Sequence, residues 1–401
     1  MYTFDEVKTF VKEEDVSFIK LAFCDIRGYQ KNISIMSEEL TRAFSDGISF
    51  DASAIYGFGD EIKSDLFLHP DPSTLAILPW RPQSGRVVRM FCDILRPDGT
   101  PYERDGRFIL KKAMQAADKK GITCYFGPEI EFYLFKTDAE GNPTRIPFDN
   151  ASYMDIAPDD RGENIRREIC LTLSDMGIRP ESSHHEEGPG QNEIDFRYDK
   201  ALASAENAVT FKAVVKTIAT RNGLDADFSP KPLEGKAGNG MHINMSVKSI
   251  DGNDYTMNFM AGILSHIEEI TLFLNPCEES YKRLGEKKAP KYITWSHENR
   301  SQLIRIPAAK DEYRRIELRS PDPMCNPYAA FALLIHAGLD GIEKRMAPPN
   351  PTDLDLFTAD AAVTKSLRQL PSSLGSALEL AKNSDFVKSI LPEEYIKFAI
   401  Y

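Results

Sequence analysis

The sequence predicts an α+β protein of two domains, and two observations support this. In the N-terminal part, residues rich in β formers fill 16–24 and 86–93, and 30–36 could pair with the first of these across the turn at 25–28. In the longer C-terminal part, segments with helical spacing alternate with apolar strands. Residues 96–101 between them concentrate turn formers, so we place the domains at 1–103 and 104–401.

Composition narrows the class of protein. The 401 residues are 42% hydrophobic, which is enough for a substantial core, and the net charge of −12 argues against a nucleic-acid or anionic-membrane surface. No apolar run reaches the roughly 18–20 residues of a membrane helix, and the N-terminus lacks a secretory signal pattern. The six cysteines are far apart and form no C-x-x-C pair, which is typical of reduced core residues. We therefore expect a cytoplasmic protein.

The C-terminal part begins with a helix followed by an unusual strand. Helical spacing predicts helices near 108–117, 165–173 and 209–218, each followed by a glycine. A strand over 123–135 would place Glu129 and Glu131 on one face and Ile130 and Phe132 on the other. Acids within so apolar a strand are costly to bury unpaired, so we expect a metal ion or a basic ligand beside them.

The segment 181–195 holds five carboxylates and two histidines around a Gly-Pro-Gly turn. A strand is predicted on each side of it, the second one through the alternating Ile194, Phe196 and Tyr198. Carboxylates at the ends of neighbouring strands can converge on a divalent cation. The alternative is an acidic surface that water solvates.

Two later segments could complete such a site. The glycine-rich loop 235–240 leads into a strand that carries His242, although linkers and core histidines give the same pattern. In a strand, Arg315, Glu317 and Arg319 share one face, and guanidinium groups hold carboxylates and phosphates bidentately. The alternative is that these arginines form internal salt bridges with the acidic residues. After them, Asn326-Pro327 predicts the start of a long apolar helix.

These residues could build a carboxylate-walled cation site that faces arginines. Oxygen-rich ligation with a single imidazole favours Mg²⁺ or Mn²⁺ over Zn²⁺. Such a site suits phosphoryl transfer from a nucleotide, yet the chain has no Walker-type loop and no kinase catalytic-loop sequence.

The chain resembles the glutamine synthetase family from about residue 16 to about residue 392. The resemblance rests on the order and spacing of several blocks: Asp51-x-Ser53-x-Ile55, Pro128 to Phe132, His184-His185-Glu186, Pro189 to Glu193, Gly238-x-Gly240-Met241-His242, Asn299-Arg300-Ser301, Arg315 to Arg319, and Pro321-Asp322-Pro323. It implies an N-terminal β-grasp domain and a catalytic domain whose curved antiparallel sheet forms a half barrel backed by helices. It also implies ATP-dependent ligation of L-glutamate and ammonia through an acyl phosphate.

The resemblance further implies a role for each site residue. Two or more Mg²⁺ or Mn²⁺ ions would be held by two ligand sets, Glu131, Glu186 and Glu193 for one ion and Glu129, His242 and Glu317 for the other. ATP would contact Glu181, Tyr198, Ser246, Arg305 and Arg315. The acid would be bound by Gly238, His242, Arg283, Arg300 and Arg319, and ammonium by Tyr153, Asp51 and Glu186. Asp51, Glu186, Arg300 and Arg319 are the expected catalytic residues.

Active sites of the family lie between subunits, so the resemblance implies a homo-oligomer, a hexameric ring or stacked rings, in which Asp51 serves a neighbour's site. The resemblance also implies a short form, because Tyr401 precedes the position of the helix that ties two rings together in many relatives.

Three positions depart from the family pattern. Lys288 stands where the flap loop normally carries a glutamate, Ala237 replaces an asparagine before the glycine-rich loop, and Asn244 replaces a histidine on the nucleotide side. The first two leave open a γ-glutamyl-amine ligase, or a ligase acting on another acid. A catalytically inactive homologue is a further alternative.

Overall fold

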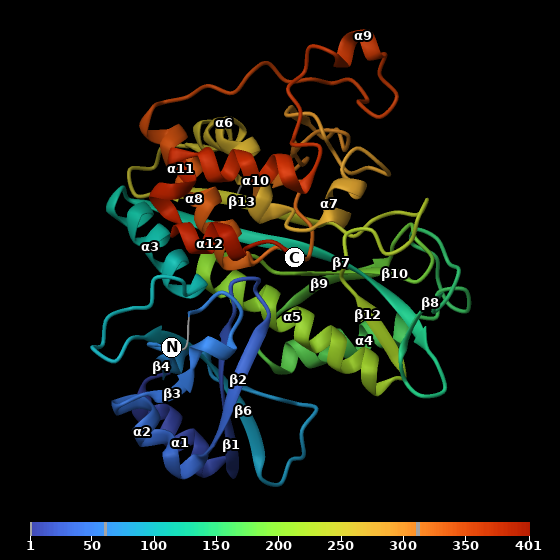
Figure 1. The fold of residues 1–401 in the computed structure, drawn as a ribbon. Helices are drawn as coiled ribbons and strands as arrows, with labels where there is room; N and C mark the ends of the chain where they lie inside the picture. Colours follow the sequence, from blue (N-terminus) through green and yellow to red (C-terminus); the bar gives the residue numbers. More distant parts are fainter. Residues whose placement is uncertain (1, 60–61, 310–312) are drawn as a thin grey trace.

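The computed structural model describes residues 2–59, 62–309 and 313–401, and it is built on two β-sheets (Figure 1). The N-terminal sheet has six strands in the order β2-β1-β6-β4-β3, with β5 paired to β6. Its strands are β1 Val16–Cys24, β2 Gln30–Met36, β3 Ile48–Asp51, β4 Asp65–Pro70, β5 Ala76–Ile77 and β6 Arg86–Leu95. The predicted hairpin is confirmed, because β1 and β2 pair antiparallel from Cys24–Gln30 to Phe18–Met36.

Helices α1 Phe4–Glu13 and α2 Leu40–Ser45 belong to this part, and together with the sheet they form the β-grasp fold. Helix α1 begins at a capping box in which Thr3 accepts from Glu6 N and the Glu6 side chain accepts from Thr3 N. Its buried residues Val7 and Val11 lie one turn apart, so the helix presents one apolar face to the core.

The second sheet has ten strands and is organised around β7, Ile122–Thr137. The order is β14-β15-β16-β13-β7-β10-β9, and β8, β11 and β12 also pair with β7. The remaining strands are β8 Pro143–Pro147, β9 Pro180–His185, β10 Gln191–Phe196, β11 Asp199–Lys200, β12 Leu224–Asp227, β13 Met241–Ser249, β14 Trp295–His297, β15 Ile304–Ile306 and β16 Ile316–Leu318. The sheet curls into the half barrel that the resemblance implied.

Helices cover the apolar side of this sheet (Figure 1). Ile130 and Phe132 of β7 are fully buried, and Phe126 of β7 stacks on Phe331 with ring centroids 4.3 Å apart. The helices of the C-terminal part are α3 Gly106–Lys119, α4 Glu163–Asp175, α5 Ala201–Arg221, α6 Thr256–Leu274, α7 Glu278–Arg283, α8 Pro327–Glu343, α9 Ala361–Thr364, α10 Leu374–Asn383, α11 Asp385–Ile390 and α12 Glu393–Phe398. The opposite side of the alternating strands therefore carries the polar residues.

Register between the strands explains why distant acids meet. Glu129 pairs with His242 of β13 on one side of β7 and with Asp195 of β10 on the other. Glu131 pairs with Glu193, and Glu317 of β16 pairs with Asn244 of β13. A shift of one residue in any of these pairings would turn the acids to the other face of the sheet.

A buried arginine connects the N-terminal sheet to the helices. Arg107 of α3 forms ion pairs with Asp71 at 2.6 Å, with Asp93 at 2.5 Å and with Glu206 of α5 at 2.7 Å. Removing one partner of a buried ion pair leaves an unpaired buried charge and strongly destabilises the fold. This cluster therefore fixes how α3 and α5 pack against the N-terminal sheet.

The elements mostly follow the sequence pattern, with three differences. The strand expected to reach residue 198 ends at Phe196, and Arg197 N instead donates to Arg179 O at 2.8 Å. Helices α6 and α7 were not predicted. Among the described residues no helix is long and apolar enough to cross a membrane, and the six cysteines are free thiols.

Candidate active site

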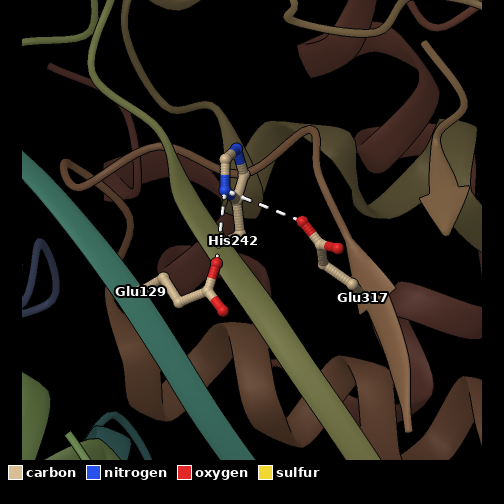
Figure 2. Close-up of side chains that lie close together, drawn as sticks. All are labelled: Glu129, His242 and Glu317. Atoms are coloured by element: carbon tan, nitrogen blue, oxygen red, sulfur yellow. Dashed lines mark ion pairs between the residues drawn. The ribbon is translucent and has the colours of Figure 1, made fainter. Parts of the chain in front are cut away.

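Glu129, His242 and Glu317 converge from three neighbouring strands (Figure 2). His242 Nδ1 lies 3.6 Å from Glu129 Oε2 and 3.8 Å from Glu317 Oε1. One potential ligand atom from each residue lies within 4.8 Å of the others. The structure thus brings together the three residues expected to form one ligand set.

The other expected set, Glu131, Glu186 and Glu193, is spread over two overlapping groups. Glu131 and Glu193 group with His242, whereas Glu186 and Glu193 group with His184. Glu186 follows β9 directly, and Glu131 Oε2 accepts from Gly240 N at 2.7 Å and from Gln191 Nε2 at 3.1 Å. Glu193 is therefore the carboxylate that connects the two groups.

Two residues that lie among these carboxylates were not predicted as ligands from the sequence. His184 Nε2 lies 3.2 Å from Glu186 Oε1 and 3.7 Å from Glu193 Oε1. Asp195 groups with Glu129 and Glu193, and its Oδ2 accepts a hydrogen bond from Ser182. The period of two along a strand was the available signal, because Asp195 follows Glu193 by two residues and His184 precedes Glu186 by two.

Glycines allow the chain to approach these side chains closely. A Cβ on Gly188 would lie 1.8 Å from the Tyr133 hydroxyl, and a Cβ on Gly240 would lie 2.7 Å from Arg283 Nη2. The glycine-rich loop therefore packs against the site and is not a linker.

The carboxylates are crowded, and the pKa shifts reflect it. Burial raises the pKa of Glu193 well above its ordinary value, and repulsion by Asp195, Glu131 and Glu129 adds to the shift. Burial also raises the pKa of Glu131, with a further contribution from Glu186. Burial would raise the pKa of Glu317 too, but His242, Arg319 and Arg305 lower it below its ordinary value. Positively charged groups thus lie beside Glu317, whereas other acids crowd Glu193.

Arginines form the facing wall. A cavity of about 290 Å³ is lined by Arg283, Arg300 and Arg319 together with Glu129, Glu131, Tyr153, Glu186, Glu193, Gly238 and His242. Arg319 Nε donates to Glu317 Oε1 at 3.1 Å, and Arg305 Nη1 donates to Glu317 Oε2 at 2.6 Å. The salt bridges left open by the sequence are therefore present at Glu317, while Arg300 faces the cavity without a described carboxylate partner.

A second cavity, of about 220 Å³, adjoins the first. It is lined by Glu181, Tyr198, Ser246 and Arg315, as expected for nucleotide contacts, and by Asn244. Glu129 lines both cavities, whereas Arg305 lines neither and points instead at Glu317 and Glu298 O.

Asp51 lies apart from both cavities. It is exposed at the end of β3, and its Oδ1 accepts from Ser53 N at 2.9 Å and from Ser53 Oγ at 2.6 Å. Its expected contribution to the active site of a neighbouring subunit stays a prediction.

The donor set suits a hard divalent cation. Several carboxylate oxygens and one or two imidazoles meet where burial and repulsion raise the pKa of Glu193, and a bound cation would offset that repulsion.

A family model described as "Glutamine synthetase, catalytic domain" matches residues 103–400, and one described as "Glutamine synthetase, beta-Grasp domain" matches 15–97. The chain belongs to the glutamine synthetase family.

Relatives of this glutamine synthetase family member match nearly its whole length. The glutamine synthetase of Methanosarcina mazei is 46% identical over 406 residues, covering 98% of this chain and 91% of that protein. The glutamine synthetase of Clostridium saccharobutylicum is 44% identical over 405 residues, covering 97% and 91%.

Solved structures agree in fold. A structure titled "GmaS/ADP complex-Conformation 1" matches with a TM-score of 0.88 at 29% identity, covering 98% of this chain and 93% of that one. The cryoEM structure of Plasmodium falciparum glutamine synthetase matches with a TM-score of 0.87 at 25% identity, covering 100% and 95%.

Proposed function

We propose that this protein is an ATP-dependent ligase that joins L-glutamate and ammonia to form L-glutamine, ADP and phosphate. The observation that carries the proposal is the position of Glu129, which lines both the arginine-walled cavity and the adjoining cavity of Tyr198 and Arg315. A nucleotide in the second cavity would direct its phosphates past Glu129 towards the acid in the first. The curated relatives at 41–46% identity, all named glutamine synthetase, support the same activity.

Two ligand sets would hold Mg²⁺ or Mn²⁺. One set is Glu129, His242 and Glu317, and the other is Glu131, Glu186 and Glu193. Bound divalent cations would offset the negative charge of phosphate and carboxylate oxygens that must approach each other. His184 extends the second set, because its Nε2 lies near both Glu186 and Glu193.

The arginines would bind the acid and stabilise charge during transfer. A carboxylate is a poor electrophile, so the side-chain carboxylate oxygen of glutamate first attacks the γ-phosphorus of ATP, and ADP leaves. Arg300 and Arg319 would stabilise the transferring phosphoryl group, and Arg283 would bind the acid. Arg283 is positioned for this by donating to Ser320 O at 2.8 Å and to Arg319 O at 3.3 Å.

The amine then completes the reaction. Its nitrogen attacks the acyl carbon, the C–O bond to phosphate breaks, and phosphate leaves with that oxygen. A carboxylate beside the amine accepts the proton that ammonium loses before it attacks. Glu186 and Tyr153 line the cavity where this would occur, and Asp51 would reach it from a neighbouring subunit.

Several further features belong to this proposal. The boundary between the two domains lies between residues 103 and 104. The functional unit is a homo-oligomer whose active sites are shared between subunits. Free thiols and the use of ATP suit a reducing compartment, so we place the protein in the cytoplasm.

ADP release and product identity, measured with a panel of acids and amines, test the proposal. Glutamate with ammonia should release ADP and form equimolar glutamine, and this should require Mg²⁺ or Mn²⁺. If glutamate with ammonia is silent while a larger amine or another acid is active, the ligase has a different substrate pair. If no pair releases ADP, the chain is an inactive homologue.

A further inference from the structure

The loop after α7, residues 285–290, places a lysine in the active-site cavity. Lys288 lines the cavity of Glu186, Tyr153 and Arg300. Its backbone carbonyl accepts a hydrogen bond from Arg319 Nη1 at 3.3 Å, which anchors the loop beside the expected catalytic residues. The Lys288 side chain therefore lies at the edge of the cavity, where it is partly exposed to solvent.

The Lys288 ammonium group lies beside one carboxylate and one aromatic ring. Its Nζ lies 2.6 Å from Glu187 Oε1 and 5.7 Å from the centroid of the Tyr153 ring. A carboxylate together with an aromatic face is a favourable environment for an ammonium group. Glu187 follows Glu186 directly, so this environment adjoins the carboxylates of the proposed cation site.

We propose that Lys288 is a tethered cation that competes with the ammonium substrate for the Glu187 carboxylate and the Tyr153 ring and must release them before ammonium binds there. The inference rests on the proposed ligase function and adds a residue that sets the apparent affinity for a cationic amine. A primary ammonium at the end of four methylenes and a free ammonium ion have the same charge, and both donate N–H hydrogen bonds, so they compete for Glu187 and Tyr153.

Displacing the lysine is inexpensive. The side chains of Lys288 and Glu187 are 53% and 34% exposed, and ion pairs with such exposure are weak. The lysine therefore competes with the substrate without blocking Glu187 and Tyr153 permanently.

Glu286, the glutamate of this loop, lies outside the cavity that Lys288 lines. Glu286 is 61% exposed, and its Oε2 lies 3.1 Å from Lys231 Nζ, outside the cavity. Lys287 and Lys288 both line the cavity, and Lys288 is the one with a described ion pair to an acid there, Glu187.

Steady-state kinetics of Lys288→Met with two nucleophiles test the inference. Ammonium enters as a cation, whereas hydroxylamine is largely uncharged near neutral pH and forms the hydroxamate at the same acyl phosphate. Removing the competing charge should lower KM for ammonium about two- to sixfold, the range expected from losing an exposed ion pair, and leave KM for hydroxylamine unchanged.

Glu286→Gln is the matched control, because it changes a charge on the same loop outside the cavity; it should leave both KM values at the wild-type level. If an active Lys288→Met enzyme has an unchanged or higher KM for ammonium, or equal shifts for both nucleophiles, the role of Lys288 is overturned while the ligase function stands. If neither the wild type nor any variant releases ADP with glutamate and either nucleophile, the proposed function fails, and this inference fails with it.

Discussion

The side-chain amide of Asn244 donates to Glu129 Oε1 at 2.8 Å, and its oxygen accepts from Arg315 Nε at 2.8 Å. One residue thereby connects a proposed cation ligand to a proposed nucleotide contact. The histidine that the family pattern has at this position could make one of these bonds with each ring nitrogen. The replacement thus preserves the connection.

Replacing Asn244 with alanine should weaken ATP binding. Both bonds involve charged groups, and losing them leaves Glu129 and Arg315 without their shared support. We expect KM for ATP to rise about tenfold or more, while Asn244→His retains KM near the wild-type value. An alanine variant with wild-type KM for ATP would show that the bridge has no role in nucleotide binding.

Glu193→Gln should have opposite effects with and without metal. Burial and the neighbouring acids destabilise the ionised Glu193 carboxylate, so its removal should raise the melting temperature of the metal-free protein by about 1–3 °C. Mn²⁺ should stabilise the wild type strongly and the variant weakly, because the shared ligand is lost. Thermal unfolding with chelator and with Mn²⁺ checks both effects. A variant that is less stable without metal, or that keeps the full response to Mn²⁺, would contradict the assignment of Glu193.

Glu186→Ala should abolish turnover while leaving the fold intact. The carboxylate lies near His184 and Glu193 and lines the cavity of the arginines, so its loss removes both a proposed ligand and a proposed amine contact. We expect kcat to fall at least about 10³-fold, with circular dichroism and oligomer size unchanged. Undiminished activity would break the assignment of Glu186.

The junction between the two sheets should make stability depend on pH. Burial raises the pKa of Asp105 to about 7, and repulsion by Asp93 adds to the shift. The folded state therefore binds the proton more tightly than the unfolded state, and the free energy of unfolding falls as pH rises from about 4 to about 7. Asp105 accepts from Arg107 N at 3.0 Å at the start of α3, and asparagine can make the same bond.

Asp105→Asn should remove this dependence. Between pH 5 and pH 8 the wild type should lose about 2 kcal/mol of unfolding free energy relative to the variant, as measured by denaturant titration at equal protein concentration. Parallel pH profiles for the two proteins would show that Asp105 keeps an ordinary pKa in the fold.

The side chains that share a face of β7 could be predicted from the sequence, because the alternation of side chains along a strand is a local pattern. Glu129 and Glu131 flank the buried Ile130, and this pattern alone places both acids on one face of β7. The pairing of Glu129 with His242 depends on strand register across more than a hundred residues of chain, which no local pattern encodes. The family motifs supplied the ligand sets that local patterns could not.

Other features depend on contacts that arise only in the folded chain. Helix α6 is apolar on nearly all sides because it packs between other helices, so it lacks the amphipathic spacing of α1. Glu187 had no expected role until Lys288 was seen beside it, and the orientation of Glu286 towards Lys231 could not be read from the loop sequence. Such loop side chains are positioned by their neighbours.

Transfer of oxygen from the acid to phosphate tests the central claim most directly. Glutamate labelled with ¹⁸O in its side-chain carboxylate, incubated with ATP, Mg²⁺ and ammonia, should yield glutamine and phosphate carrying one ¹⁸O from that carboxylate. Phosphate without label, or labelled phosphate that forms only when ammonia is replaced by a larger amine, would contradict the account.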